Sequence, residues 1–467
     1  MDRAPAEAPP VTRLRRELGL RDALAIGIGG TVGGGIFTLV KVAADTAGPA
    51  ALLAFVLASA VSVLIALPYA ELACRLPVAG GGYAFAREVL GERWGFAMGW
   101  IYWGGYLLAS GYITIGFGEY LQAAGGPPAP VGAVGLVALC TGVNLLGARL
   151  AGWAQTGVLL VAVTGFVAFA VWGAGEVGTA TLTPFAPHGV SGVLLATPVV
   201  FLAFGGFDMV AAAGEEIRRP ERNLPLAILL TLAVVLALYL LVALVAFGTT
   251  PTRVLGSSAS PLADVARGFG GEPARWLMLG CALLTLAAAG NALLMVTSRA
   301  LFAMARDGLL PRGLAAVRPG SGTPRTAVAV DGALLAAVAL TGSVSLAATA
   351  GGFLYVLHFL PPLLALVRLR RDPTAPAPAF RTPAPRLLLP LAFLAVVGML
   401  VATGPRGAAT GLAWLALGAC VYGARRALAG GGPQSAPPAP PPPRPPPRAG
   451  ARGRGARAPP PPPPPLG

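Results

Sequence analysis

Long apolar runs recur along the whole chain and limit what it can fold into. A helix needs about 20 apolar residues to cross a bilayer core that is about 30 Å thick. The sequence has twelve runs of this kind, at residues 21–46, 50–74, 94–122, 130–148, 152–175, 192–217, 224–248, 273–306, 325–342, 345–367, 386–403 and 407–427. Only 11% of the residues are charged, compared with about 25% in soluble domains. We therefore expect an all-α integral membrane protein with twelve transmembrane helices, whose first run is too long to be a cleaved signal peptide.

The basic residues are distributed unequally between the two sides of the membrane. The chain has 34 lysines and arginines and a formal net charge of +15, a balance that is often a sign of nucleic-acid binding. With the N-terminus placed in the cytoplasm, 29 of them fall on the cytoplasmic side. The other five are Lys41, Arg253, Arg267, Arg275 and Arg406. This asymmetry predicts a multi-pass protein of the cell membrane with both termini in the cytoplasm, and it explains the charge without nucleic acid as a partner.

The same pattern divides the chain into three regions. Residues 1–17 are a cytoplasmic N-terminal segment, residues 18–427 the twelve-helix domain, and residues 428–467 a tail of Gly, Pro, Arg and Ala. Because the tail cannot bury apolar area, we expect it to be disordered with polyproline stretches. Its arginines either contact anionic lipid headgroups or reflect compositional drift. They are Arg444, Arg448, Arg452, Arg454 and Arg457.

Residues with the chemistry of metal sites are few and scattered. The cysteines stand alone in or beside apolar runs, at Cys74, Cys140, Cys281 and Cys420. The two histidines, His188 and His358, complete no ligand cluster. We therefore expect neither a metal site nor a cofactor, and we expect His358 to be a packing residue.

The first apolar run has a cluster of glycines in its middle. Five of the seven residues from Gly29 to Gly35 are glycine, and glycine is a poor helix former. Inside a membrane a helix break is tolerated only where it lines a protein cavity. Such a break presents N–H groups at the start of the outer half-helix and C=O groups at the end of the inner one, which favour an anion and a cation respectively. A zwitterion such as an amino acid offers both charges.

The sixth run contains a second interruption, at residues 201–208, which include Gly205 and Gly206. If spans 1–5 and 6–10 are two units, the two interruptions occupy corresponding positions. Paired interruptions of this kind are the best sequence indication of a transporter's central site. The alternative is that the glycines allow close helix packing.

Four stretches together resemble the amino acid–polyamine–organocation superfamily of permeases. They are Gly29–Phe37; Tyr69–Leu72 with Pro77–Tyr83; Phe204–Asp208 with Glu215–Pro220 and Asn223–Pro225; and Ser298–Arg299 with Ala305–Pro311. Each alone is weak or moderate, but their order and spacing are specific. The resemblance runs from about Leu18 to the end of the twelfth run. It implies a LeuT-like fold of two inverted five-helix repeats, at about 21–175 and 192–367, followed by two further helices at about 386–427.

The resemblance also implies where a substrate would bind. Its carboxylate would meet the backbone N–H groups of residues 33–35, and its ammonium group would meet the carbonyl groups of Thr31, Leu202 and Gly205. In some members the position of Leu202 is a bulky aromatic residue that caps the substrate, whereas here it is aliphatic. The expected substrate-binding residues are Thr31, Val32, Gly33, Gly34, Gly35, Ile36, Leu202, Phe204, Gly205, Gly206 and Phe207.

The sequence leaves the source of the driving force open. Many proton-coupled relatives have a lysine in helix 5 where this chain has Ala162, and a sodium site would need helix 8 oxygens such as those of Thr285 and Asn291. Asp208 is the coupling candidate, because acids inside the membrane are costly and usually functional; the alternative is a carboxylate fixed by neighbouring hydroxyl or backbone groups. Asp331 is expected to be peripheral. The gating candidates are Phe201, Glu71, Glu215 and Glu216.

Together these patterns predict a secondary transporter, not an enzyme, that moves amino acids of a neutral or broad range by alternating access. Exchange, facilitated flux and proton symport are all compatible with the sequence. One alternative is a membrane sensor that binds amino acids with little transport, and another is a polyamine or organocation permease. An intramembrane enzyme is disfavoured, because no histidine stands beside an obvious nucleophile.

Overall fold

The structure is a computed structural model that describes residues 18–76, 81–146, 151–212, 216–317, 323–375 and 377–428. The chain divides into one unit up to Arg425 and a second from Arg426 to Gly467. The predictions for the N-terminal segment, for the tail beyond Leu428 and for Glu215 fall outside the described residues.

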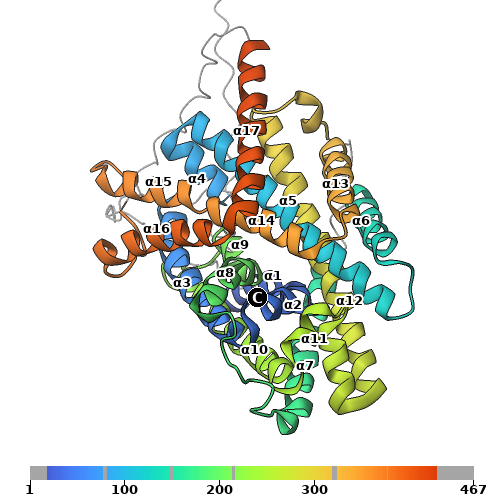
Figure 1. Ribbon diagram of the computed structural model, residues 1–467. Coiled ribbons are helices and arrows are strands. Elements are labelled where there is room, and N and C mark those ends of the chain that lie inside the picture. Colours follow the sequence, from blue (N-terminus) through green and yellow to red (C-terminus); the bar gives the residue numbers. More distant parts are fainter. Residues whose placement is uncertain are drawn as a thin grey trace, which may run out of the picture. The chain divides into compact units, whose positions relative to one another are not determined.

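Helices account for most of the described residues (Figure 1). The α-helices are α1 (Leu20–Thr31), α2 (Gly35–Ala47), α3 (Ala51–Arg75), α4 (Gly81–Leu90), α5 (Glu92–Ala123), α6 (Ala129–Leu146), α7 (Ala151–Gly173), α8 (Gly189–Phe201), α9 (Phe207–Ala212), α10 (Pro220–Thr249), α11 (Thr252–Ser257), α12 (Pro261–Arg306), α13 (Arg325–Leu340), α14 (Val344–Leu357), α15 (Leu360–Arg371), α16 (Pro385–Ala402) and α17 (Gly404–Leu428). Short 3₁₀ turns are η1 (Gly48–Ala50), η3 (Ala174–Glu176), η4 (Leu202–Phe204) and η5 (Arg312–Ala315). The backbone also forms an isolated parallel bridge between Leu18 and Ile217.

Within the described residues, eight helical segments are long and apolar enough to cross a membrane. They are Gly35–Arg75, Ala129–Leu146, Gly157–Glu176, Pro220–Thr249, Pro261–Arg306, Val344–Arg371, Pro385–Ala402 and Gly404–Ala427. The chain is therefore a multi-pass helical membrane protein, as predicted. Helices also lie at every other predicted run, but α8 is cut short by the second break and α13 is 16 residues long. The full count of twelve spans and the repeat symmetry remain predictions.

Both predicted breaks are present and they lie against each other. The first separates α1 from α2, where Val32 leaves the helical conformation with φ −73° and ψ 66°. The second separates η4 from α9, where Gly206 has a φ of +126° that side chains rarely adopt. Figure 1 places α1, α2, α8 and α9 together among the surrounding helices, with α1 against α9 and α2 against α8.

Two later helices are also interrupted. Gly271, with φ 63° and ψ −158°, divides α12 two residues before the predicted start of that span. The segment from α14 to α15 is interrupted at His358 and Phe359, and Pro361 and Pro362 lie in the first turn of α15. Each proline lacks an N–H group, so the carbonyl four residues earlier loses its helical partner.

Candidate substrate site between the two breaks

A cavity of about 540 Å³ lies between the two breaks. Of the predicted substrate-binding residues it is lined by Thr31, Gly33, Gly34, Gly35, Leu202 and Gly205. These come from two segments about 170 residues apart in sequence. Glycine is required in this part of the lining because the two segments pack closely: a Cβ atom on Gly35 would lie 2.7 Å from Cβ of Ala203. The two breaks therefore form one surface.

The other predicted residues stand behind this surface. Ile36, Phe204 and Phe207 are completely buried and belong to the apolar core. Val32 lines a separate space of about 10 Å³ with Thr285. Gly206 supports the site from behind, because a Cβ atom there would lie 2.6 Å from Oγ1 of Thr31 and 2.7 Å from the carbonyl carbon of Gly30.

The backbone at the breaks is partly hydrogen-bonded within the protein. The carbonyl oxygen of Thr31 accepts the N–H of Gly33 at 2.7 Å, and the carbonyl oxygen of Leu202 accepts the N–H of Gly205 at 3.2 Å. The hydroxyl group of Tyr239 lies 2.9 Å from the Thr31 carbonyl oxygen and 3.2 Å from that of Ala203, so α10 ties the two breaks together. Because α2 begins at the break, its first N–H groups lack the helical carbonyl partners of later turns, and such groups favour an anion.

Side chains that the sequence motifs did not identify complete the cavity. Tyr106 and Tyr112 come from α5 and Tyr355 comes from α14, while Met209 and Met295 add flexible apolar surface. The spacing of tyrosines along the third run was visible in the sequence, but no pattern indicated which face would meet the breaks. Among the described residues that line the cavity there is no carboxylate, and Arg299 is the charged side chain.

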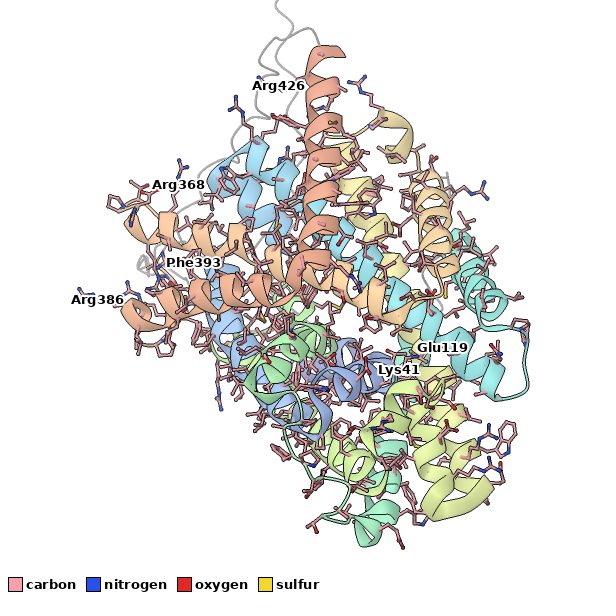
Figure 2. All side chains as sticks on the ribbon, viewed as in Figure 1. Lys41, Glu119, Arg368, Arg386, Phe393 and Arg426 are labelled. Carbon is pink, nitrogen blue, oxygen red and sulfur yellow. The ribbon has the colours of Figure 1, made fainter. Side chains whose placement is uncertain are left out.

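The cavity extends away from the breaks in one direction. Its lining continues along α1 to Ala25 and along α12 to Arg299. Beyond the opposite end of the breaks, Nζ of Lys41 on α2 lies 2.5 Å from Oε2 of Glu119 on α5, and both side chains are mostly buried (Figure 2). This ion pair joins α2 and α5 on the side away from the opening.

Asp208 lies directly behind the cavity wall. Its carboxylate is 3% exposed and accepts the hydroxyl group of Tyr106 at 2.5 Å and the N–H of Gly206 at 3.2 Å. Tyr106 lines the cavity, so a single tyrosine separates this carboxylate from it. Asp331 does not line the cavity, but it is fully buried and accepts the indole N–H of Trp103 at 2.8 Å and the hydroxyl group of Thr297.

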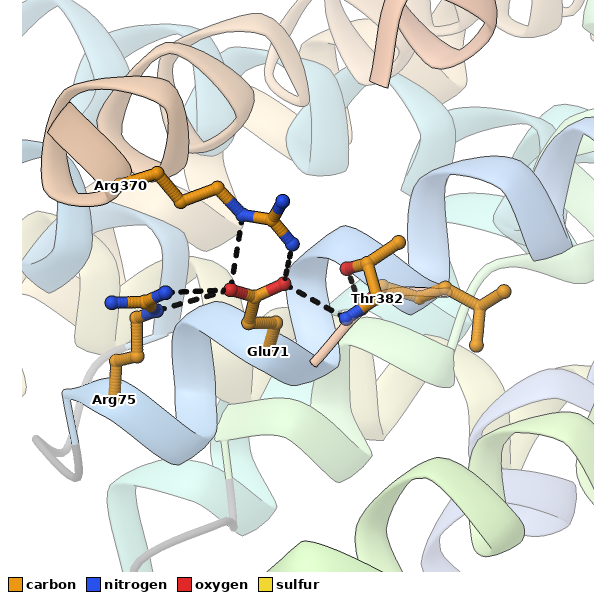
Figure 3. A network of polar contacts seen from close by, with 5 residues as sticks. Glu71, Arg75, Arg370 and Thr382 are labelled. Carbon is orange, nitrogen blue, oxygen red and sulfur yellow. Dashed lines mark hydrogen bonds and ion pairs between the residues drawn. The ribbon is translucent and has the colours of Figure 1, made fainter. Parts of the chain in front are cut away.

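The gating candidates have different surroundings. Glu71 is completely buried and forms ion pairs with Arg75 and Arg370 (Figure 3). It also accepts the backbone N–H of Thr382 at 2.9 Å, which connects α3 with α15 and with the segment before α16. Phe201 is buried against Tyr355, and the carbonyl group of Glu216 accepts the N–H of Leu18 at 2.9 Å.

Broken helices that enclose a cavity within a multi-pass bundle define a class, the membrane permeases. Residues 18–422 match the family model described as amino acid permease, and the chain belongs to that family.

Several curated transporters are similar over most of their length. An uncharacterized transporter of Mycobacterium tuberculosis is 34% identical, covering 88% of this chain and 92% of the relative. A branched-chain amino acid permease of Bacillus subtilis is 30% identical, with the same coverage of both chains. The human cationic amino acid transporter 4 is 31% identical, covering 80% of this chain and 63% of the relative.

Proposed function

We propose that this permease carries neutral amino acids by alternating access through the cavity between the breaks. The observation that carries the proposal is the meeting of six predicted residues from the two breaks and the helix ends beside them around one space. The substrate carboxylate binds at the start of α2, where helix N–H groups favour an anion. The ammonium group binds the carbonyl groups at the ends of the interrupted helices.

The cavity lining supports a neutral side chain. The names of the relatives include both branched-chain and cationic amino acids, so they do not separate these classes. A cationic side chain in a low-dielectric site needs a partner of opposite charge, and the described lining residues provide Arg299 and no acid. The same argument disfavours a polyamine. Tyr112, Tyr355 and the methionines suit a large apolar or hydroxylated side chain.

The predicted topology gives the cavity a direction. With both termini in the cytoplasm, the opening between Ala25 and Arg299 faces the cytoplasm, and the Lys41–Glu119 pair closes the outer side. We propose that the protein cycles between this conformation and one open outwards. Asp208 is the coupling candidate, and Glu71 with its arginines holds the inner ends of α3 and α15 in one of the two conformations.

A ligand screen followed by flux measurements tests this function. Purified protein is heated with each of the amino acids and with polyamines, and the ligands that raise its melting temperature are then offered to proteoliposomes with and without a proton gradient. We expect stabilisation and uptake with large neutral amino acids. Stabilisation without flux would favour the sensor alternative, and stabilisation by arginine or polyamines alone would contradict the neutral substrate class.

A further inference from the structure

His358, at the end of α14, is a buried polar side chain without a well-formed hydrogen bond. Its side chain is fully buried, and neither Nδ1 nor Nε2 makes a hydrogen bond of good geometry, although the backbone of Tyr355, three residues earlier, interacts with the ring. A neutral imidazole carries one donor and one acceptor, and buried polar groups are normally satisfied. The packing role expected from the sequence explains its burial but does not explain an imidazole without a well-formed hydrogen bond.

Among the described residues, Asp208 is the acid that lies beside His358. Nε2 of His358 lies 3.9 Å from Oδ2 of Asp208, the same oxygen that accepts the hydroxyl group of Tyr106. This distance is too long for a hydrogen bond, and a movement of about 1 Å would bring it into the usual range. Asp208 is the second residue of α9, which begins directly after the second break. His358 lies in the interruption between α14 and α15.

Among the described residues of this region, Asp208 is the carboxylic acid and His358 is the imidazole base. Tyrosines from three helices surround them: Tyr106 of α5 donates to Asp208, the rings of Tyr102 and Tyr106 of α5 and of Tyr355 of α14 contact the imidazole, and Tyr69 of α3 contacts Phe359. Phe201 of α8 and Phe359 add aromatic rings. Among the described residues, no lysine or arginine forms an ion pair with Asp208.

The junction that carries His358 is able to bend. Pro361 and Pro362 remove two N–H donors, so the carbonyl groups of Leu357 and His358 lose their helical partners. A bend there moves the imidazole relative to α9 without breaking further helical hydrogen bonds. Kinks at prolines are a common location for such hinges.

We propose that His358 and Asp208 form a latch whose closure depends on the protonation of Asp208. When Asp208 is ionised, Nε2–H of the neutral imidazole donates to Oδ2 and draws the α14–α15 junction towards the second break. When Asp208 takes up a proton, its charge is cancelled and this charge-assisted hydrogen bond is lost. The imidazole and the carboxyl group then stand apart, as at the 3.9 Å between Nε2 and Oδ2 in this structure. The proton enters and leaves beside Tyr106, which contacts both Asp208 and the cavity. His358 stays neutral throughout and acts as a positioning residue.

The latch rests on the proposed transport function and adds a link between a proton and the movement of α14 and α15. The test is the pH profile of exchange and of gradient-driven uptake in proteoliposomes. His358→Gln and His358→Asn are a matched pair, because the amide nitrogen of Gln reaches the position of Nε2 whereas that of Asn reaches only the position of Nδ1. His188→Gln, at an exposed histidine, is the control.

We expect the wild type, His358→Gln and His188→Gln to share one profile. In His358→Asn we expect exchange to continue, while the pH midpoint moves by about one unit, a typical environmental shift, or the dependence disappears. Asp208→Asn should remove the pH dependence, and adding His358→Asn to it should change nothing more. A His358→Asn profile equal to the wild-type profile would overturn the latch, and so would a wild type without pH dependence, although in both cases transport itself would stand. Absence of binding and transport by folded wild-type protein would instead overturn the proposed function together with the latch.

Discussion

Gly206 allows the two breaks to lie in contact because it has no Cβ atom. Its φ of +126° is a conformation that L side chains rarely adopt, and a Cβ atom would lie 2.6 to 2.8 Å from atoms of Gly30 and Thr31. The colliding atoms include backbone, which cannot move aside as a flexible side chain can. This residue therefore supports the cavity without lining it.

Gly206→Ala should separate the breaks and reduce uptake by about 5- to 150-fold, corresponding to the roughly 1–3 kcal/mol typical of local backbone strain. Initial uptake rates in proteoliposomes measure this. Gly91→Ala is the matched control, because Gly91 has a φ of +96° and nothing within 4 Å of the added atom. The control should lower stability and leave uptake per folded molecule unchanged. Equal loss of uptake in both variants would mean that strain, and not the contact, is responsible.

Tyr239 is the second residue on which the geometry of the breaks depends. Tyr239→Phe removes the hydroxyl group that lies near the Thr31 and Ala203 carbonyl oxygens. A hydrogen bond contributes about 1 kcal/mol, so we expect uptake to fall several-fold. Tyr120→Phe is the control, since this buried tyrosine donates to Phe37 at 3.1 Å, away from the second break. An effect on uptake in the control as large as in Tyr239→Phe would contradict the bridging role.

At the scale of elements, buried charge connects helices that would otherwise meet through apolar surface. Glu71 holds α3, α15 and the segment at Thr382 together. Glu71→Gln leaves Arg75 and Arg370 without a carboxylate, so the free energy of unfolding should fall by about 3 kcal/mol, as for other broken buried pairs. Thermal unfolding in detergent checks this. Glu272→Gln, which breaks the pairs of a half-exposed carboxylate with Arg267 and Arg275, should change stability by less than about 1 kcal/mol, and a similar loss in both variants would contradict the account of Glu71.

The Lys41–Glu119 pair is predicted to hold the outer side closed. Glu119→Gln should weaken that closure and shift the balance of conformations several-fold, corresponding to about 1 kcal/mol for a partly buried pair. The ratio of outward to inward substrate affinity in oriented proteoliposomes reports this shift. The exchanged pair Lys41→Glu with Glu119→Lys should restore the wild-type ratio. Failure of the exchange to restore it, with both variants folded, would mean that the charges act separately.

At the scale of the whole molecule, the sequence predicted those features that depend on local chemistry. Apolar runs located the helices, and glycines at 33–35 and 205–206 located the breaks, because a membrane penalises unpaired backbone wherever it occurs. The motifs also identified six residues that line the cavity. They did not separate these from Ile36, Phe204 and Phe207, since sequence spacing does not tell which face of a short half-helix meets the core.

What the sequence could not provide came from pairings across long distances in the chain. Tyr106 with Asp208, Tyr239 with the two breaks, and Glu71 with Arg370 each join residues more than 30 positions apart. Their contacts depend on how the helices pack, which no local pattern specifies. The same holds for His358, whose burial was expected but whose position beside Asp208 was not.

The most direct test of the account is the uptake of leucine and of arginine by proteoliposomes that contain the wild type or Gly206→Ala. The account predicts time-dependent leucine uptake that excess unlabelled neutral amino acids inhibit, little arginine uptake, and loss of leucine uptake in the variant. Arginine uptake without uptake of any neutral amino acid, or equal leucine uptake by both proteins, would contradict a neutral substrate site built on the contact between the two breaks.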